Sequence, residues 1–262
     1  MSDAIYRLDR LGVRYGRATA IDRVTLDIAR GERVAVVGPN GSGKSTLLRV
    51  MGGLICPTSG SLVFNGSPLS ALPSRERARQ IAYVPQDTSV PFEFSIREIV
   101  AMGRSPYLGA LGFETPADLA AIETAMDRME LGGLADRSIL DVSGGERQRA
   151  MIARALAQQP AVLLLDEPAA NLDLKHQVDL HRALDDLQHT QGLTAVMVSH
   201  DLNAVTDCAR VIVLSDGTIH AMGTPAEVFT ERMIREVFAC RALIDRHPQT
   251  GRPRLTVDWG RG

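Results

Sequence analysis

The chain has very little lysine, almost no net charge and no long apolar run. Only two of its 29 lysine and arginine residues are lysine, and its formal net charge is −2 at pH 7. A nucleic-acid partner is not expected, because such proteins carry a basic patch that this balance of charge does not provide. The longest apolar stretches hold about five residues. A membrane-spanning helix needs roughly 18, so any membrane connection should run through a partner.

Paired cysteines and metal-ligand spacings are also missing. The three cysteines, Cys56, Cys208 and Cys240, are scattered and form no C-x-x-C pair, which favours a reduced cytosolic setting. The histidines lack the spacing of metal ligands, so no structural metal site is expected. The N-terminus has no apolar segment of the kind found in a signal peptide. At 262 residues and 45% hydrophobic content, the chain should form one large globular domain or two small ones.

The most informative stretch is Gly-Pro-Asn-Gly-Ser-Gly-Lys-Ser at residues 38–45. It fits G-x-x-x-x-G-K-[ST], the P-loop, whose glycines let backbone N–H groups curl around a phosphate. Lys44 can reach the β- and γ-phosphates, and the Ser45 hydroxyl can ligate Mg²⁺. An otherwise arginine-rich chain keeps lysine here because a compact ammonium fits inside a ring of amides, whereas a planar guanidinium does not.

Periodicity predicts an α/β fold. Residues 4–28 alternate between apolar and polar, which predicts antiparallel strands with turns at Gly12, Gly16 and Gly31. The spacing of apolar residues is helical from about 95 to 157. The rest of the sequence predicts a helix and six strands, of which the run at 34–37 should be buried, and the alternation of strands with helices favours a parallel sheet. The strands are expected at 34–37, 61–64, 81–84, 162–165, 195–198 and 211–214, and the helix at 45–53.

Domain boundaries follow from this pattern. We expect one domain over residues 1–262, with its core at about 1–87 and 160–240. An inserted helical subdomain should occupy about 88–159. The chain becomes rich in proline and arginine at about 241–262, which predicts a tail that is either loose or docked.

Two carboxylates end the apolar run Val162–Leu165. Asp166, at the carboxyl tip of this expected strand, can orient Mg²⁺ near the P-loop. Side chains alternate along a strand, so Glu167 should point the other way, where it could polarise a water molecule.

A second anion-binding helix start is predicted at Ser143-Gly144-Gly145-Glu146. Ser143 can cap the helix while Glu146, three residues later, completes a capping box. The two glycines would allow close approach by a ligand.

These motifs, taken in order, resemble those of ATP-binding cassette (ABC) ATPases over about residues 5–240. Residues 38–45 look like Walker A, 163–166 like Walker B and 143–146 like the signature. The resemblance implies a P-loop NTPase of the ABC type, with an antiparallel N-terminal β-subdomain and an inserted α-helical subdomain. Gln86 matches the Q-loop, Asn171-Leu172-Asp173 the D-loop and His200 the switch histidine. Tyr15 lies where the family stacks an aromatic ring on adenine.

The same resemblance implies the ligands and the roles of individual residues. The ligands are ATP and Mg²⁺. The catalytic residues would be Glu167 as the base, His200, Lys44 and Gln86, and the metal ligands Ser45, Gln86 and Asp166. Two copies would sandwich two ATP molecules, each held by one P-loop and the opposite signature. The residues that would bind nucleotide are Tyr15, Gly38, Pro39, Asn40, Gly41, Ser42, Gly43, Lys44, Ser45, Thr46, Ser143, Gly144, Gly145, Glu146 and Asp173.

The sequence differs from the common pattern of the family in three places. The signature begins with Val142 rather than leucine and has Glu146 where glutamine is commonest. The D-loop region reads Ala169-Ala170-Asn171, without the usual serine or threonine. None of them removes a residue expected to ligate phosphate or Mg²⁺.

A finer resemblance is to ATPases of bacterial importers for iron–siderophores, haem and cobalamin, carried by residues 100–107, 171–177 and 247–253. It implies a peripheral protein at the cytoplasmic face of the cell membrane, bound to two permease subunits and, through them, to a substrate-binding protein. The permease would dock beside Gln86 and residues 92–104, although Phe92 and Phe94 fit a subdomain core equally well. A soluble ABC ATPase, as in iron–sulfur cluster assembly, and an exporter ATPase stay open, as does the transported substrate.

Overall fold

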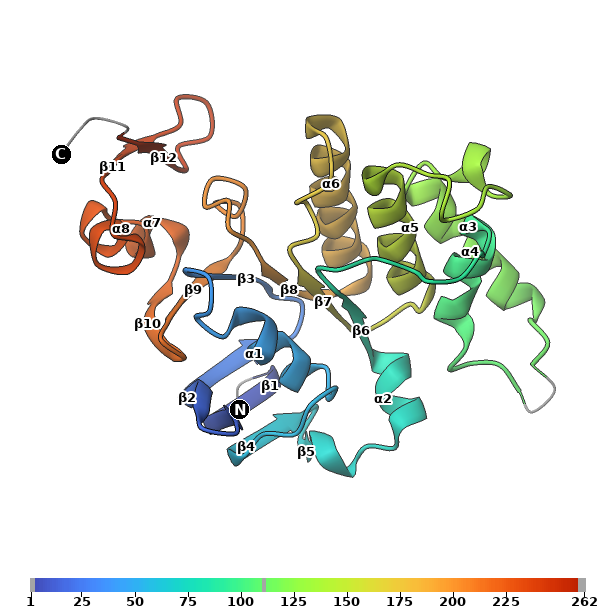
Figure 1. Ribbon diagram of the computed structural model, residues 1–262, viewed down its shortest axis with the longest axis horizontal. Coiled ribbons are helices and arrows are strands. Elements are labelled where there is room, and N and C mark those ends of the chain that lie inside the picture. Colours follow the sequence, from blue (N-terminus) through green and yellow to red (C-terminus); the bar gives the residue numbers. More distant parts are fainter. Residues whose placement is uncertain (1–2, 110–111, 259–262) are drawn as a thin grey trace. The chain divides into compact units, whose positions relative to one another are not determined.

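The computed structural model describes residues 3–109 and 112–258 (Figure 1). The chain divides into two compact units. Unit one comprises Met1–Leu69 and Val196–Gly262, and unit two comprises Ser70–Ala195. Strand β8 (Thr194–Val198) carries the chain from unit two into unit one. Within the two described ranges, no helix combines the length and the apolar character needed to cross a membrane.

Unit one begins with the antiparallel sheet that the alternating pattern predicted. Its strand order is β2-β1-β4-β5. A turn at Gly16 joins β1 to β2, as expected. The turn predicted at Gly12 is wrong, because Gly12 lies inside β1, where a Cβ would be 2.4 Å from the Ser59 hydroxyl oxygen. The strands are β1 (Ala4–Tyr15), β2 (Ala18–Ala29), β4 (Ser59–Phe64) and β5 (Ser67–Pro68).

A second sheet in unit one carries the P-loop. β3 (Arg33–Val37) pairs in parallel with β9 (Arg210–Ser215), and β10 (Thr218–Gly223) adds an antiparallel edge. All five residues of β3 are buried, as expected for a strand covered on both faces. The remaining elements of unit one are α1 (Lys44–Met51), α7 (Pro225–Val228), α8 (Glu231–Phe238) and a hairpin of β11 (Ala242–Arg246) and β12 (Pro253–Val257).

Unit two combines a parallel strand pair with helices. β6 (Ile81–Val84) pairs in parallel with β7 (Val162–Asp166), whose residues are all buried. The stretch predicted to be helical contains no strand between residues 96 and 157 in its described part, and α3, α4 and α5 pack on one another. The helices are α2 (Ser74–Gln80), α3 (Ile96–Ala101), α4 (Pro116–Arg128), α5 (Gly144–Ala157) and α6 (Leu174–Gln191), with 3₁₀ turns at Leu69–Ala71, Met102–Arg104 and Gly132–Leu134. The expected α/β class, with parallel strand pairs and a separate antiparallel sheet, is confirmed.

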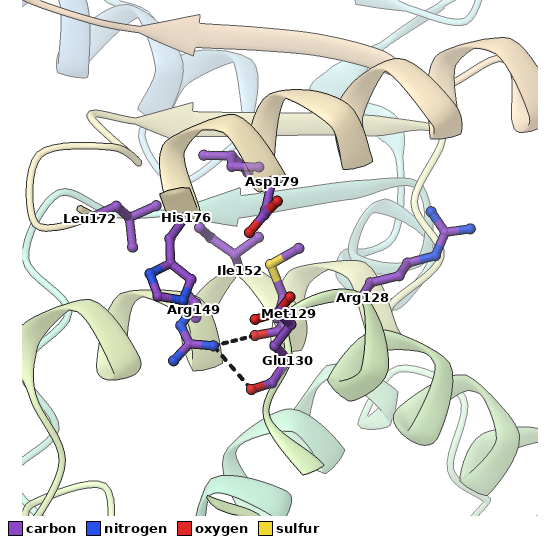
Figure 2. Close-up of a pocket in the computed structure, with 9 residues that line it drawn as sticks. Arg128, Met129, Glu130, Arg149, Ile152, Leu172, His176 and Asp179 are labelled. Carbon is purple, nitrogen blue, oxygen red and sulfur yellow. Dashed lines mark hydrogen bonds between the residues drawn. The ribbon is translucent and has the colours of Figure 1, made fainter. Parts of the chain in front are cut away.

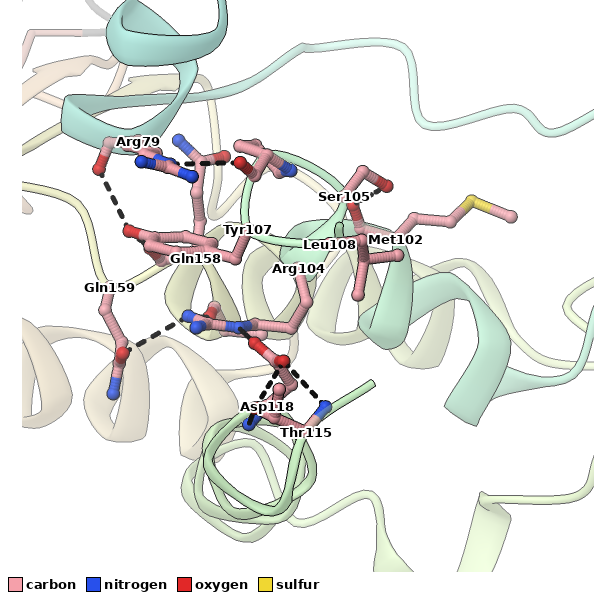
Figure 3. Close-up of polar contacts among 12 residues, drawn as sticks. Arg79, Met102, Arg104, Ser105, Tyr107, Leu108, Thr115, Asp118, Gln158 and Gln159 are labelled. Atoms are coloured by element: carbon pink, nitrogen blue, oxygen red, sulfur yellow. Dashed lines mark hydrogen bonds and ion pairs between the residues drawn. The ribbon is translucent and has the colours of Figure 1, made fainter. Parts of the chain in front are cut away.

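A buried arginine fixes the segment that follows α3 (Figure 3). Arg104 is 5% exposed, and its Nε lies 2.8 Å from the carboxylate of Asp118. Its Nη1 donates to the Ala157 carbonyl at 2.9 Å, and its guanidinium carbon lies 3.8 Å from the centre of the Tyr107 ring. Thr115 caps α4 through the same Asp118, whose pKa is lowered to about 2 by the Thr115 hydroxyl and N–H and by Arg104. One charge cluster thus joins the 3₁₀ turn, α4 and the end of α5.

Candidate functional site

The P-loop joins β3 to α1 and can hold no side chain at two of its glycines. A Cβ on Gly38 would lie 2.1 Å from the Leu214 carbonyl oxygen, and one on Gly43 would lie 2.3 Å from that of Ala20. Gly43 has φ +99° and is the residue from which α1 starts. The first turn of α1 contains no acidic residue. Its N–H groups therefore point into the loop with the positive end of the helix dipole, which favours an anion.

Lys44 is folded into this loop. Its ammonium donates to the carbonyl oxygens of Gly38 at 2.8 Å and Pro39 at 2.9 Å, and the residue is only 7% exposed. The Ser42 hydroxyl of the same loop is buried and has no hydrogen-bond partner among the described residues. Asn40 and Gly41 are exposed at the crest. The loop thus combines a buried cation, an unsatisfied hydroxyl and oriented N–H groups, which together fit a phosphate chain.

The two carboxylates at the end of β7, Asp166 and Glu167, are hydrogen-bonded to residues at and just after the end of β6, and the sequence did not predict all of these contacts. Asp166 is 1% exposed and accepts a hydrogen bond from the Tyr83 hydroxyl at 3.2 Å. Glu167 accepts one from the Gln86 side-chain amide at 3.0 Å. Tyr83 was not recognised as part of the site, because its place depends on the register in which it faces Leu164 across the strand pair.

Glu167 does not continue the strand as expected. β7 ends at Asp166, and Glu167 has φ +51°, a left-handed conformation that non-glycine residues seldom adopt. The alternation argument for its direction was therefore wrong, since alternation holds only within a strand. The turn instead brings its carboxylate to Gln86. Backbone strain of this kind is typical of functional positions.

The signature segment forms the predicted capping box at the start of α5. The Ser143 hydroxyl accepts from the Glu146 N–H at 3.2 Å, and the Glu146 carboxylate accepts from the Ser143 N–H and hydroxyl, both at 2.8 Å. These donors, the backbone N–H first, lower the pKa of Glu146. Gly144 has open space where a Cβ would stand, but a Cβ on Gly145 would lie 3.0 Å from the Asn171 carbonyl oxygen. The close neighbour of Gly145 is therefore the D-loop of the same chain.

The D-loop runs from Glu167 into α6. The Ala170 N–H donates to the Glu167 carbonyl at 3.3 Å, which closes a turn over residues 167–170. The segment that leads into the D-loop therefore starts with Glu167 as the first residue of a turn. Asp173 caps α6 by accepting from the His176 N–H at 2.9 Å, which lowers its pKa. The carboxylate also lies 2.7 Å from His176 Nδ1. Asp173, expected to bind nucleotide, is thus placed as a helix cap whose side chain is 67% exposed.

A small cavity lies between the signature helix and the start of α6 (Figure 2). Arg149 fastens α5 to the end of α4 by donating from Nη1 to the carbonyls of Met129 at 2.7 Å and Glu130 at 3.0 Å. Its Nε is buried and has no hydrogen-bond partner in the described part of the chain. Leu172 of the D-loop and His176 line the same cavity, whose volume of about 10 Å³ suits a single water molecule.

His200 follows β8 in unit one. It is exposed, and its neighbour Ser199 donates its N–H to the Val36 carbonyl at 3.2 Å, two residues before the P-loop. The histidine thus leaves the sheet beside the strand that supplies the phosphate loop. Tyr15, expected to stack on adenine, ends β1 with 51% of its surface exposed.

The sequence left open whether Phe92 and Phe94 belong to a subdomain core or to a docking surface, and the structure places the pair mostly outside the core. Phe92 is 66% exposed and meets Phe94 edge to face, with ring centres 6.4 Å apart. Phe92 is therefore not a core residue of the helical segment, and the interpretation of this residue as subdomain core is wrong.

Each unit contains its own group of the expected residues. Unit one contains residues 38–46, His200 and Tyr15. Unit two contains Gln86 with Glu167, Asp166 with Tyr83, and the signature with the D-loop.

Comparison with known proteins gives a family match and close relatives. The ABC transporter family matches residues 21–170. The cobalamin import ATP-binding protein of Halobacterium salinarum is 43% identical over 247 residues, covering 94% of this chain and 62% of that protein. The chain therefore spans under two thirds of that relative's length. The ferric enterobactin transport ATP-binding protein of Escherichia coli is 38% identical over 264 residues, covering 100% of this chain and 97% of that protein.

Solved structures share the fold. A putative metal-chelate type ABC transporter in an inward-facing conformation has a TM-score of 0.83 at 28% identity, covering 98% of both chains. A dimeric ATP-binding cassette in a post-hydrolysis state, bound to ADP and Pi, has a TM-score of 0.77 at 30% identity. That match covers 84% of this chain and 98% of the other.

Proposed function

The chain belongs to the ABC transporter family of ATP-hydrolysing proteins, and from that premise we propose that it powers a bacterial importer of an iron chelate, haem or cobalamin. One observation carries the catalytic part: the Gln86 amide holds the carboxylate of Glu167, which a left-handed turn places just beyond a buried strand. The names of the relatives support the import part. The proposal includes the division into a core (about 1–87 and 160–240), a helical subdomain (about 88–159) and a tail.

Phosphate binding falls to the P-loop. Lys44 already points into the loop, where its ammonium is held by two carbonyl oxygens. A phosphate oxygen would compete for this ammonium as a charged acceptor, and hydrogen bonds between charged groups are the stronger ones. Residues 38–46 would hold the β- and γ-phosphates through backbone N–H groups, with Tyr15 stacked on the adenine ring.

Mg²⁺ fits the oxygen donors that the sequence offers. The Ser45 hydroxyl, the Gln86 amide oxygen and the Asp166 carboxylate are hard ligands, which Mg²⁺ prefers. When bound, the ion neutralises charge on the phosphate oxygens. The Tyr83 hydroxyl keeps the Asp166 carboxylate in one orientation at the strand tip.

Glu167 is the proposed base. The hydrogen bond from the Gln86 amide orients the Glu167 carboxylate, and a carboxylate oriented in this way can accept a proton from an attacking water molecule. His200 would donate a hydrogen bond to the γ-phosphate. The products are ADP and inorganic phosphate.

The signature residues 143–146 and Asp173 would serve a second copy of the chain. The first turn of α5 presents its N–H groups beside Gly144, where there is open space for a ligand. In a head-to-tail homodimer each signature would close the ATP site of the opposite copy. The dimeric ADP-bound cassette with the same fold supports this arrangement. ATP binding would close the dimer and hydrolysis would reopen it.

Coupling to transport would run through residues 92–104 and two permease subunits at the cytoplasmic face of the membrane. Phe92, which follows Gln86 after five intervening residues, is exposed and offers an apolar anchor for a permease helix. A substrate-binding protein would deliver the cargo to the permease and select it.

Three experiments test this function. Glu167→Gln should still bind ATP but hydrolyse it at least about 100-fold more slowly, and should accumulate as a dimer with ATP. Turnover near the wild-type rate would refute the assignment of the base.

The wild-type chain, captured from its native membrane in detergent, should bring along a multi-span permease, identified by mass spectrometry. Phe92→Asp should hydrolyse ATP normally yet lose the permease. Recovery of soluble partners alone would overturn the importer proposal and leave the ATP site standing.

A further inference from the structure

The loop that carries His200 is anchored at two points. We define this histidine loop as residues 199–206. Its first anchor is the bond from the Ser199 N–H to the Val36 carbonyl at 3.2 Å. Within the loop, the Asp201 carboxylate accepts from the N–H groups of Asn203 at 2.9 Å and Ala204 at 3.3 Å. The loop contains no regular helix or strand, so its conformation depends on such contacts.

The second anchor comes from the C-terminal hairpin, 52 residues further along the chain. The Asn203 side-chain amide donates to the Leu255 carbonyl at 3.0 Å, and the Leu255 N–H donates to the Asn203 side-chain oxygen at 2.8 Å. The amide thus pairs with β12 in the way that a neighbouring strand would. Both backbone groups of Leu255 are committed to this pair, and the Leu255 side chain is 8% exposed.

The hairpin is built to keep β12 in place. Its strands are tied by Arg254 and Asp245, whose nearest charged atoms are 2.6 Å apart. The turn is closed by the His247 N–H donating to the Arg252 carbonyl at 2.8 Å and by the Gly251 N–H donating to the His247 carbonyl at 2.9 Å. Gly251 has φ +68°, which a turn of this shape requires of glycine. The proline- and arginine-rich stretch at 247–253 therefore forms the turn of a hairpin that is held together by hydrogen bonds and an ion pair.

We propose that the C-terminal hairpin positions His200 for the γ-phosphate, with Asn203 as the positioning residue. The inference rests on the proposed role of His200. Held at Val36 on one side and at Leu255 on the other, the exposed histidine keeps a fixed backbone on both flanks. Release of the Leu255 anchor removes the two hydrogen bonds between Asn203 and the hairpin, so this flank of the loop is held less tightly. Misplacement of a catalytic group by about 1 Å can cost a rate factor of about 100, so a loosened loop lowers turnover.

The test uses the full chain with Asn203→Ala. We expect kcat to fall about tenfold, the loss that about 1.4 kcal/mol of transition-state stabilisation produces. Affinity for ADP should stay within about twofold of wild type, because ADP has no γ-phosphate for His200 to contact. Hydrogen exchange should speed up at residues 199–206 and at the Leu255 amide, and nowhere in unit two. Asn203→Asp keeps the acceptor for the Leu255 N–H but places an oxygen against the Leu255 carbonyl, so it should not restore activity.

Thr206→Ala is the matched control. It removes a hydrogen bond within the same loop, from the Thr206 hydroxyl to the Asn203 carbonyl at 3.0 Å, and leaves the hairpin contact intact. Its kcat should stay within about twofold of wild type. If it slows turnover as much as Asn203→Ala does, the hairpin has no special part and the inference fails.

The outcomes separate this inference from the proposed function. A wild-type chain without ATPase activity refutes the proposed function itself. An active wild type, an inactive His200→Ala and an Asn203→Ala variant within twofold of wild type refute the positioning role alone. Equal losses of kcat and ADP affinity in Asn203→Ala, with faster exchange throughout unit one, would mean general destabilisation and also overturn it.

Discussion

Replacing the buried Arg104 with methionine should cost far more stability than replacing an exposed arginine in the same helical segment. Arg104→Met removes the hydrogen bonds to Asp118 and to the Ala157 carbonyl, and the stacking on Tyr107. The Asp118 carboxylate would stay buried without its counter-charge, since its side chain is 5% exposed. Breaking one side of a buried ion pair costs about 3–5 kcal/mol.

The matched control is Arg97→Met. Arg97 pairs with Glu123 on α4, but the two side chains are 42% and 51% exposed. Exposed pairs contribute about 0.2–1 kcal/mol. Both variants exchange arginine for methionine in the same subdomain, so the difference between them measures how much more the buried contacts of Arg104 contribute than an exposed ion pair.

Urea unfolding followed by circular dichroism at 222 nm measures the free energy of unfolding of both variants. Because a chain with two units need not unfold in one step, hydrogen exchange should accompany it. We expect faster exchange around Arg104 and the start of α4 at Asp118 in Arg104→Met. Equal destabilisation by the two variants would refute the claim that the buried cluster holds this segment together.

The remaining predictions concern the P-loop, the signature and acid stability. Lys44→Arg should abolish tight ATP binding in equilibrium titrations, because a guanidinium is too wide to sit between the two carbonyls that hold the ammonium; full affinity would contradict this. Ser143→Arg should block hydrolysis while ADP affinity of the monomer stays unchanged, and a large drop in that affinity would argue against a role in the opposite site. The pKa of Asp118 is lowered from 3.8 to about 2, so its stabilising effect is complete above pH 4 and is lost as pH falls towards 2. Asp118→Asn should therefore be less stable than wild type at pH 7, with the difference shrinking over that range in acid unfolding; a constant difference would refute it.

Local patterns predicted the elements that depend on local causes. The run Val34–Val37 and the glycines after it specify a buried strand and a phosphate loop within a dozen residues, and both are found. The capping box at Ser143 and Glu146 was likewise readable, because its partners are three residues apart. Gly12 misled because glycine permits both a turn and a close approach, and only the position of Ser59 decides between them.

Features that depend on distant partners could not be predicted. Tyr83 reaches Asp166 only through the register of two strands far apart in the sequence. The contact between Asn203 and Leu255 needs a hairpin whose proline- and arginine-rich sequence gave no clear strand pattern. The left-handed turn at Glu167 has no signal in residue type, since glutamate does not favour that conformation.

The two glycines of the signature, Gly144 and Gly145, are required for different structural reasons. A Cβ on Gly145 would lie 3.0 Å from the Asn171 carbonyl oxygen, so a side chain there would push the D-loop of the same chain by a few tenths of an ångström, whereas Gly144 faces open space. A methyl group at 145 therefore disturbs internal packing before any nucleotide arrives, and a methyl group at 144 meets only what comes from outside. A defect in Gly145→Ala reports on the fit between signature and D-loop, and a defect in Gly144→Ala reports on access by a ligand. Substituting each glycine in turn therefore separates the packing within one subunit from the contacts that the subunit makes with a ligand in the site of another.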